Sequence, residues 1–426
     1  MMHRKLTLAL ILLSTLLSTF AFAQTESTLY TFSETSTFWP NGTLLEDSKG
    51  NFYGTTRGGG AYGMGTVFEF SPPAVVGGAW VYTTLYSFVP YGKGGWLPIS
   101  DLVQDQTGAF YGTTYEGGDP ICNCGAVYKL TPPVVTGGNW TESQLYAFPW
   151  DDIHGRSPAN AALVLGAHGT LYGVTIQGGA WDSGVIYELQ TKNGKSYTET
   201  DLYSFGDNAD GSTPNGPIAL DSSGNLYGVT LWGGAFNQGT VYKYTPATRT
   251  AAAAETILYS FGTSGSADGA NPSGNLVFDA SGDIYGVTNA GGNAEGEGTV
   301  FTLTKSGTTY TESLLFTFVD HSTTGNFPVA GLSWNTTNQS LYGTTSQFGD
   351  IGNGAGTVYQ LLPPATKGGT WTFTSLFTFP YGVGGGYPTG IVTRDPTTGN
   401  LYGTAQNGGI EGCDLYCGTI WEIANP

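Results

Sequence analysis

Histidines and carboxylates are the side chains of this chain that could move protons, and they are scattered. Three of the four histidines lie beyond the first few residues: His154, His168 and His321. A histidine base needs a partner within hydrogen-bond reach, and glycoside hydrolysis needs two carboxylates at a set separation. The acidic pairs follow no pattern, and the chain has no HExxH sequence and no nucleophile elbow. A lyase or glycoside hydrolase that uses loop carboxylates and histidine therefore stays an alternative to a binding function.

Tryptophans and acids in glycine-rich segments indicate a different chemistry, the recognition of sugars. Flat aromatic rings provide apolar faces on which sugar rings stack, and carboxylates accept hydrogen bonds from sugar hydroxyls. For any single tryptophan, the competing interpretation is that it fills a gap between structural repeats. The candidate ligand-binding residues are Trp39, Trp96, Trp150, Asp151, Asp152, His154, Trp181, Trp232 and His321.

One repeated unit must position these residues. The segment GNLYGVT at 224–230 returns with small changes throughout the chain, and its tyrosine recurs every 55 to 61 residues. A ring that occurs once per repeat is expected in the core, with its hydroxyl on a polar partner and with the following glycine leaving room for a neighbour. The seven repeated tyrosines are Tyr53, Tyr111, Tyr172, Tyr227, Tyr285, Tyr342 and Tyr402.

Each repeat contains four short strand-like pieces. In the fourth repeat these are Gly216–Asp221, Leu226–Thr230, Gly239–Tyr244 and Glu255–Phe261. They are rich in β-branched and aromatic residues and are separated by Gly, Asn, Asp and Pro. Seven repeats of four antiparallel strands predict an all-β, seven-bladed β-propeller. A β-helix is the alternative, although its coils are much shorter than these repeats.

The ring is expected to close with a strand from the N-terminus. The LYSF-like piece occurs seven times, and its first copy, Leu29–Phe32, precedes the first repeat. The last repeat ends at Gly418–Ile423 without such a piece. Ser27–Phe32 should therefore form the outer strand of the last blade, which would remove a bare sheet edge.

A D-x-x-G sequence precedes most of the repeated tyrosines. In such a turn the aspartate bonds the local backbone and the glycine takes a positive φ. Calcium binding by these acids is a weaker alternative, and no other cofactor or metal is expected. The turns begin at Asp47, Asp105, Asp221 and Asp279, with Asn335 and Asp395 in the same role in repeats six and seven.

The most variable segments should share one face of the propeller. They are the loops from the second to the third strand, such as Gly178–Ser183 and Leu231–Phe236, and the connections between blades, such as Tyr91–Pro98 and Pro149–Pro158. Variable loops on a rigid scaffold commonly carry function. All five candidate tryptophans are therefore expected on that face.

The N-terminal sequence and the net charge indicate where the protein is located and which binding partners it can have. Residues 1–23 have the pattern of a secretory signal peptide, with a basic start, an apolar run and a small-residue site ending at Ala23. The expected product is one domain, 24–426, secreted or periplasmic, monomeric and without a membrane anchor. Its net charge changes from −18 to −20 when Arg4 and Lys5 are lost, which argues against nucleic acid as a partner.

The four cysteines form two local pairs, Cys122 with Cys124 and Cys413 with Cys417. Disulfides are expected in an exported protein. The two pairs belong to repeats that are not neighbours, so each pair is expected to close within its own loop.

The order of motifs, LYSF, P, D-x-x-GNLYGTT, GG and GTVFEL, resembles the GloVer-type tandem repeats of bacterial secreted proteins. The resemblance covers essentially the whole chain after residue 23. It implies a propeller-like extracellular protein of undetermined biochemical role and supplies no catalytic residues. The favoured hypothesis is a secreted, non-catalytic binding or scaffold module, with extracellular polysaccharide as partner. A protein-binding adhesion or matrix component is a further alternative.

Overall fold

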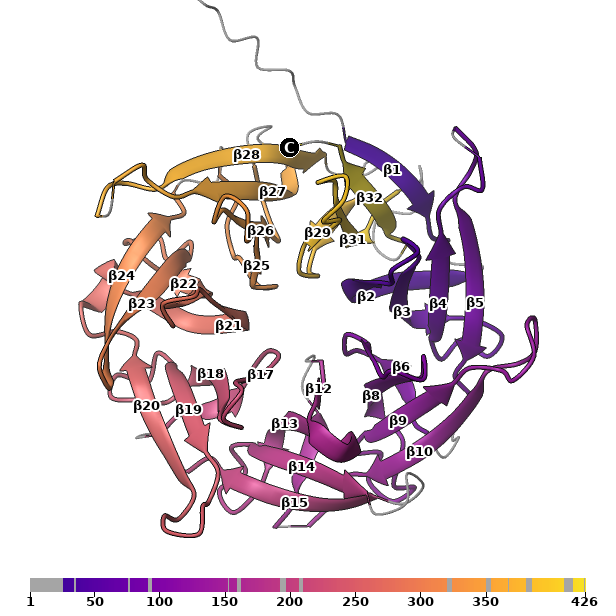
Figure 1. Ribbon diagram of the computed structural model, residues 1–426, viewed down its shortest axis with the longest axis horizontal. Coiled ribbons are helices and arrows are strands. Elements are labelled where there is room, and N and C mark those ends of the chain that lie inside the picture. The colour runs from indigo at the N-terminus through magenta and orange to yellow at the C-terminus, as the bar shows by residue number, and fades with distance from the viewer. Residues whose placement is uncertain are drawn as a thin grey trace, which may run out of the picture.

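Seven antiparallel sheets surround a central axis in the computed structural model (Figure 1). The structure describes residues 26–426 except 34–35, 76, 91–93, 152, 159–161, 192–196, 207–209, 320–323, 350–353, 367, 381–384, 410–416 and 425. The predicted seven-bladed, all-β fold is confirmed.

Blade 4 shows how one repeat becomes one blade. Its inner strand has two pieces, β16 (Ser212–Pro214) and β17 (Ala219–Leu220), which both pair with β18 (Leu226–Trp232). Strands β19 (Thr240–Thr245) and β20 (Ala254–Ser260) follow outward, each antiparallel to the one before. The inner strand begins earlier than the sequence predicts, because the segment read as a connection between blades forms its first piece.

The other blades repeat this order from the axis outward. Blades 1 to 3 are formed by β2 (Thr37–Glu46), β3 (Phe52–Gly59), β4 (Thr66–Ser71) and β5 (Val81–Ser87); by β6 (Trp96–Pro98), β7 (Val103–Gln104), β8 (Phe110–Glu116), β9 (Ala126–Thr131) and β10 (Thr141–Ala147); and by β11 (Gly155–Pro158), β12 (Val164–Leu165), β13 (Leu171–Gly178), β14 (Val185–Thr191) and β15 (Tyr197–Ser204). Blades 5 to 7 are formed by β21 (Gly269–Phe278), β22 (Ile284–Gly291), β23 (Thr299–Ser306) and β24 (Thr309–Thr317); by β25 (Leu332–Trp334), β26 (Leu341–Thr345), β27 (Gly354–Leu362) and β28 (Thr372–Pro380); and by β29 (Gly386–Pro388), β30 (Thr393–Arg394), β31 (Leu401–Asn407) and β32 (Thr419–Ile423), which pairs with β1 (Glu26–Thr31).

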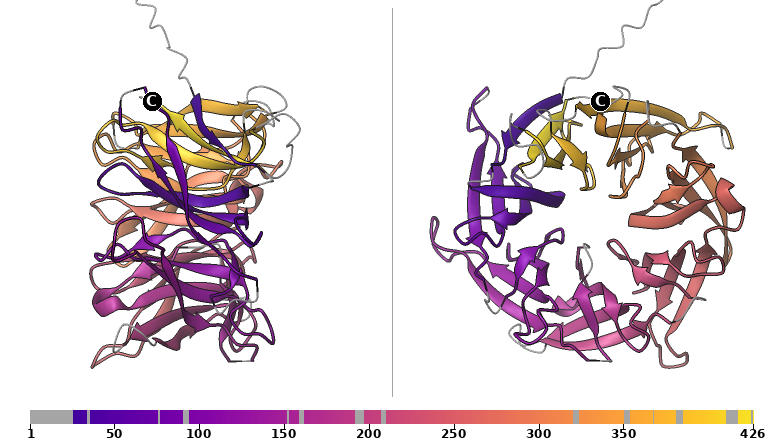
Figure 2. Two further views of the ribbon diagram at one scale, coloured as in Figure 1. Left: turned by 90° about the vertical axis from the view of Figure 1, so that its right-hand side faces the viewer. Right: turned by 180° about the vertical axis from the view of Figure 1, so that it is seen from behind.

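The N-terminal strand closes the ring, as predicted. Strand β1 pairs antiparallel with β32 from Glu26 opposite Ile423 to Thr31 opposite Thr419. The Phe32 amide then donates to the Gly418 carbonyl over 2.9 Å. In the right-hand view of Figure 2, indigo β1 lies beside the yellow C-terminal strands.

A left-handed residue followed by proline recurs at each junction between blades, and the proline contacts the preceding blade. We call this pair the left-handed step. The residue preceding the proline of each inner strand has a φ between +53° and +58°, as in Thr213 before Pro214. A Cβ on the glycine that opens the preceding third strand would lie 2.5 to 2.7 Å from that proline's Cδ at all seven junctions, as for Gly184 and Pro214. The Thr213 amide also donates to the Ser183 carbonyl over 2.8 Å. Proline of one blade therefore fills the place of a side chain in its neighbour.

The glycine after each repeated tyrosine accommodates an aromatic ring of the third strand, as predicted. A Cβ on Gly286 would lie 2.6 Å from Phe301 and 3.0 Å from Leu276. In the other blades the ring belongs to Phe68, Tyr128, Tyr187, Tyr242, Tyr359 or Trp421.

Substituting Gly286→Ala should destabilise the protein by about 1–3 kcal/mol, because a methyl group must displace a packed ring. Chemical unfolding of this variant measures the cost. In a Phe301→Leu background the same substitution should cost less, because the ring is absent. Equal costs in the two backgrounds would contradict this account of the tyrosine-glycine pair.

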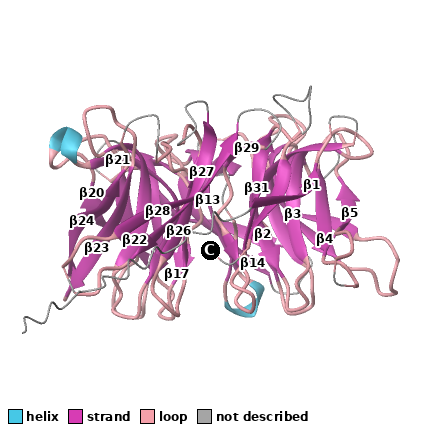
Figure 3. Cartoon of the chain, turned by 90° about the horizontal axis from the view of Figure 1, so that it is seen from above, coloured by secondary structure: helices cyan, strands magenta, loops and turns pink. Residues whose placement is uncertain are grey.

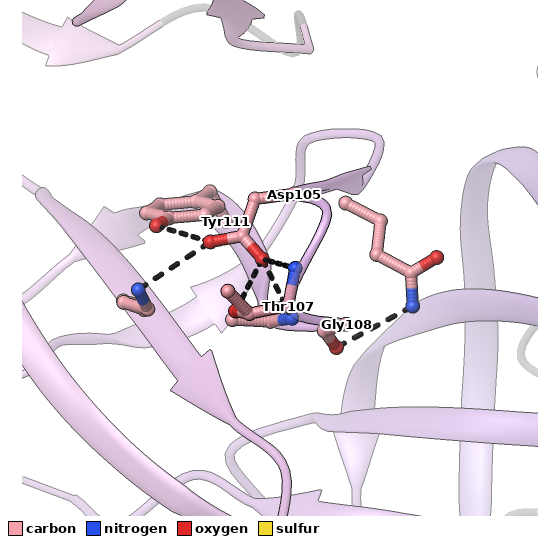
Figure 4. Close-up of polar contacts among 7 residues, drawn as sticks. Asp105, Thr107, Gly108 and Tyr111 are labelled. Atoms are coloured by element: carbon pink, nitrogen blue, oxygen red, sulfur yellow. Dashed lines mark hydrogen bonds and ion pairs between the residues drawn. The ribbon is translucent and has the colours of Figure 1, made fainter. Parts of the chain in front are cut away.

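The D-x-x-G turns bond their own backbone, as predicted. The Asp105 Oδ1 atom accepts the amides of Thr107 (2.8 Å) and Ala109 (3.1 Å), and its Oδ2 accepts the Tyr111 hydroxyl over 2.9 Å (Figure 4). Burial would raise the pKa of Asp105, but these hydrogen bonds outweigh it and lower that pKa. The aspartate therefore links the turn to the core tyrosine.

Candidate functional site

The two faces of the ring carry different segments. Turn η1 (Ala167–Gly169) is part of a D-x-x-G-type turn, whereas η2 (Gly265–Ala267) lies between blades 4 and 5, and the two occupy opposite faces in Figure 3. We call the face of η2, which also carries the loops between second and third strands, the loop face. The other face is the turn face.

Three of the candidate tryptophans are strongly exposed. Trp150 follows blade 2, Trp181 joins β13 to β14, and Trp232 ends β18. Their exposed fractions are 67%, 62% and 45%. They come from consecutive parts of the ring, on the blade ends that form the loop face.

The prediction of an exposed ligand-binding side chain is wrong for Trp96. It lies in inner strand β6, is 7% exposed, and packs in the core between blades 1 and 2. Its indole nitrogen donates to Glu116 over 3.0 Å. Trp39 is partly buried in β2, with the Arg57 guanidinium 5.5 Å from its ring. Trp39 itself has the positive φ that precedes the proline of an inner strand, and Trp96 lies one residue before such a position. Both segments were predicted to be loops between blades.

Asp151 and His154 lie together beside Trp150. Asp151 Oδ1 accepts the amides of Ile153 (2.9 Å) and His154 (2.7 Å), and its Oδ2 lies 2.8 Å from His154 Nδ1. The Nε2 atom of His154 faces the Glu199 carboxylate at 3.7 Å. Burial would raise the pKa of Asp151, but hydrogen bonds from His154 outweigh it and lower that pKa. Both imidazole nitrogens thus face carboxylates, which holds the ring in place.

Arg156 and Asp182 extend this group, and neither was predicted as a site residue from the sequence. The Arg156 guanidinium lies 4.4 Å from the Trp150 ring centroid and forms an ion pair with Asp182 at 2.7 Å. The ion pair joins the inner strand β11 of blade 3 to the loop that carries Trp181. The chain has 14 Lys and Arg residues, and 12 of them remain when Arg4 and Lys5 are left out. This scarcity of cations was the signal that could have identified Arg156 from the sequence.

Four glutamates with raised pKa values lie away from the axis. Glu142, Glu255 and Glu312 occupy outer strands, and burial raises their pKa values to about 7, 8 and 7. Burial, with repulsion from Asp201, also raises the pKa of Glu199. The Oε1 atom of each of these glutamates has no hydrogen-bond partner among the described residues. They face neighbouring blades and do not form an axial catalytic cluster.

A polar cavity of 220 Å³ lies on the axis. Its lining includes Asn41, Asp101, Asn215, Asn289 and Gln406, from five blades. Burial raises the pKa of Asp101, which accepts the Thr43 amide over 2.6 Å. Across the described residues, no group of three or more His, Cys, Asp or Glu side chains is placed to hold a metal ion.

The remaining candidates fall partly outside the described residues. Asp152, His321 and Cys413 are among them. Cys122 and Cys124 form a disulfide, and Cys417 is also disulfide-bonded. The pairing of Cys413 with Cys417 stays a prediction.

Non-reducing peptide mapping of the protein should find Cys122 linked to Cys124 and Cys413 linked to Cys417. Each bond closes a very short loop, so reduction should change the unfolding midpoint little. A peptide that links Cys122 or Cys124 to Cys413 or Cys417 would show that the pairing is wrong.

The closed ring of seven four-stranded sheets defines a seven-bladed β-propeller. The chain belongs to the Gloeobacter/Verrucomicrobia repeat family, whose repeat pattern matches residues 16–158, 76–276 and 250–425. No curated protein matches the chain. Among the described residues, no helix is long and apolar enough to cross a membrane.

Several solved structures are similar to this chain at low sequence identity. A protein of unknown function from Dyadobacter fermentans is 13% identical, with a TM-score of 0.43 over 93% of this chain and 98% of that one. An α-L-arabinanase from Penicillium chrysogenum complexed with arabinobiose is 13% identical, with a TM-score of 0.46 over 83% and 98%. A PL25 ulvan lyase is 11% identical, with a TM-score of 0.45 over 83% and 87%.

Proposed function

We propose that the protein is a secreted or periplasmic, non-catalytic module that binds neutral extracellular polysaccharide on its loop face. The observation that carries this proposal is the exposure of Trp150, Trp181 and Trp232, at 45% to 67%, on one side of the ring. The other tryptophans are buried or partly buried, as in Trp421 at 0% and Trp371, which is partly buried. Exposed aromatic rings in neighbouring loops suit the apolar faces of sugar rings.

Trp150 is held as a rigid platform. The guanidinium of Arg156 lies over its ring, and the ion pair with Asp182 fixes that guanidinium. A cation placed over an indole stabilises its orientation, while two thirds of the side chain stays exposed. A ring held in this way loses little conformational entropy when a ligand stacks on it.

The charges around this platform favour an uncharged ligand. The only cation contacting Trp150 in the described structure, Arg156, is already paired with Asp182. Asp151 lies alongside, and the net charge after residue 23 is −20, from −18 less the two cations Arg4 and Lys5. Such a surface repels polyanions, whereas carboxylates accept hydrogen bonds from sugar hydroxyls.

Non-catalytic binding fits the environment of His154. A histidine base would need a nitrogen directed at the substrate. Here Nδ1 contacts Asp151 and Nε2 faces Glu199. The site therefore supports binding better than proton transfer.

The test is a polysaccharide array followed by titration of the wild type and a Trp150→Ala variant. Neutral polysaccharides should bind with micromolar to millimolar Kd, and the variant should lose about tenfold in affinity, or ~1.4 kcal/mol. Its unfolding midpoint should match the wild type, because the side chain is exposed.

Trp371→Ala is the matched control. This ring lies 6.1 Å from Tyr285 and packs against the core of blades 5 and 6, so its loss should lower stability and leave binding unchanged in folded protein. The protein would be an enzyme instead if the array gave no hits and if the wild type turned over a glycan while the His154→Ala variant did not. Capture of a secreted protein through the loop face, without glycan binding, would favour an adhesion role.

A further inference from the structure

Blade 4 repeats the loop that carries Trp181, with phenylalanine in its place. The segments GGAWDSG and GGAFNQG join second and third strands in blades 3 and 4. Asp182 and Asn237 have φ values of +53° and +54°, and their side chains accept the amides of Gly178 (2.9 Å) and Gly233 (3.0 Å). The two loops thus have one conformation, and Phe236 is 50% exposed.

An aspartate held by a tyrosine lies next to each of these aromatic rings. Asp268 Oδ2 accepts the Tyr259 hydroxyl over 2.8 Å and the Gly262 amide over 2.9 Å. At the preceding junction, Asp210 Oδ2 accepts the Tyr203 hydroxyl and, over 3.1 Å, the Gly206 amide. The combination of exposed ring, aspartate and tyrosine therefore occurs at two successive blade junctions.

The junction of blades 4 and 5 contains a hollow of 510 Å³. Phe236 and the 2% exposed Asp268 line it, together with Gln238, Ser266 and Asn293. Its size falls within the roughly 300–1,000 Å³ range of small-molecule sites. The side chains of Gln238 and Ser266 form no hydrogen bond with any described residue and are available to sugar hydroxyls. Among the lining glycines, Gly265 borders open space, since nothing lies within 4 Å of a Cβ placed on it.

We propose that this hollow binds one sugar unit of a neutral polysaccharide and that the Trp181 junction binds another unit of the same chain. The inference rests on the proposed function and adds a second, equivalent subsite one blade away. Two subsites engaged by one polymer raise affinity through effective concentration without any new contact. The ligand class is then a repeating neutral glycan long enough to reach both junctions.

The experiment titrates Trp181→Ala, Phe236→Ala and the double variant with neutral glucan, xylan, mannan, galactan and arabinan oligosaccharides, from disaccharide to decasaccharide. In the wild type, affinity should rise steeply once the chain reaches both subsites. Each single variant should lose about tenfold for the longest chains and little for disaccharides, so that the length dependence flattens.

Tyr62→Ala is the control, because Tyr62 occupies the same loop position in blade 1 and is 55% exposed, but Gly94 takes the place of the aspartate at its junction. It should bind as the wild type does. A Phe236→Ala variant with wild-type affinity at all lengths, while Trp181→Ala and Trp150→Ala weaken binding, would overturn the second subsite alone. A wild type that binds no glycan would overturn the proposed function as well.

Discussion

A mature chain that lacks residues 24–32 is expected to lose its single cooperative unfolding transition and to aggregate. We call residues 24–426, the product expected from cleavage after Ala23, the mature chain. The deletion removes β1, which covers the edge of β32 through antiparallel pairing. It also removes Phe32, which is fully buried against Phe68 and other residues between blades 7 and 1, and Tyr30, whose ring stacks on Tyr82 at 4.6 Å. An uncovered edge strand and an opened core together favour association between chains.

Calorimetry and light scattering of the truncated and mature chains measure this effect. A Phe32→Ala variant isolates the packing contribution, and a loss of about 3–5 kcal/mol is expected because the side chain is fully buried. This variant keeps the backbone pairing and should stay monomeric. If the truncated chain is monomeric and unfolds at the same temperature as the mature chain, the closing strand does not hold the ring together.

The protein should be more stable near pH 5 than near pH 8. The carboxyl groups of Glu142, Glu255 and Glu312 have folded-state pKa values of about 7, 8 and 7, above their ordinary value of 4.5. Burial is the main cause, and Asp210 and Asp268 add repulsion to Glu255 and Glu312. Because the folded state holds these protons more tightly than the unfolded state, the free energy of unfolding falls as pH rises through this window.

Thermal unfolding between pH 5 and pH 8.5 checks the direction of the pH dependence of stability and identifies the residues that cause it. The midpoint should fall by several degrees in the wild type. A variant with Gln at positions 142, 199, 255 and 312 should lose most of this dependence. Ser143→Ala is the control, because Ser143 is exposed on the same strand as Glu142 and carries no titratable group, so its replacement should leave the pH profile unchanged. A wild-type midpoint that rises toward pH 8 would contradict the burial of protonated glutamates.

The fold was predictable because one sequence unit fixes one blade. The tyrosine-glycine pair, the D-x-x-G turn and the displaced LYSF piece each have a local physical reason, and the structure confirms all three. The inner strands were not predictable in full. Residues such as Thr213 precede proline with a positive φ, a conformation that sequence preferences disfavour. Contacts with the preceding blade stabilise it, and those contacts are absent from the local sequence.

The candidate site was predictable only where exposure depends on the loop itself. Trp150 and Trp181 lie in loops that pass over blade ends, and Trp232 is the last residue of β18, so their exposure followed from the repeat. Trp96 occupies a similar place in the sequence, but the inner strand directs it into the core between two blades. Arg156 and Glu199 reach the site from the inner and the outer strand of blade 3, and their positions beside Trp150 and His154 depend on tertiary packing that the local sequence does not specify.

Footprinting of tryptophan side chains tests the central claim most directly. The mature protein would be oxidised by hydroxyl radicals with and without the neutral polysaccharide that binds it best on the array, and each tryptophan would be measured by mass spectrometry. The account predicts that Trp150 and Trp181 are protected by the glycan, while partly buried Trp334 and Trp371 react equally in both states. Equal oxidation of Trp150 and Trp181 with and without saturating glycan would contradict recognition by the loop face.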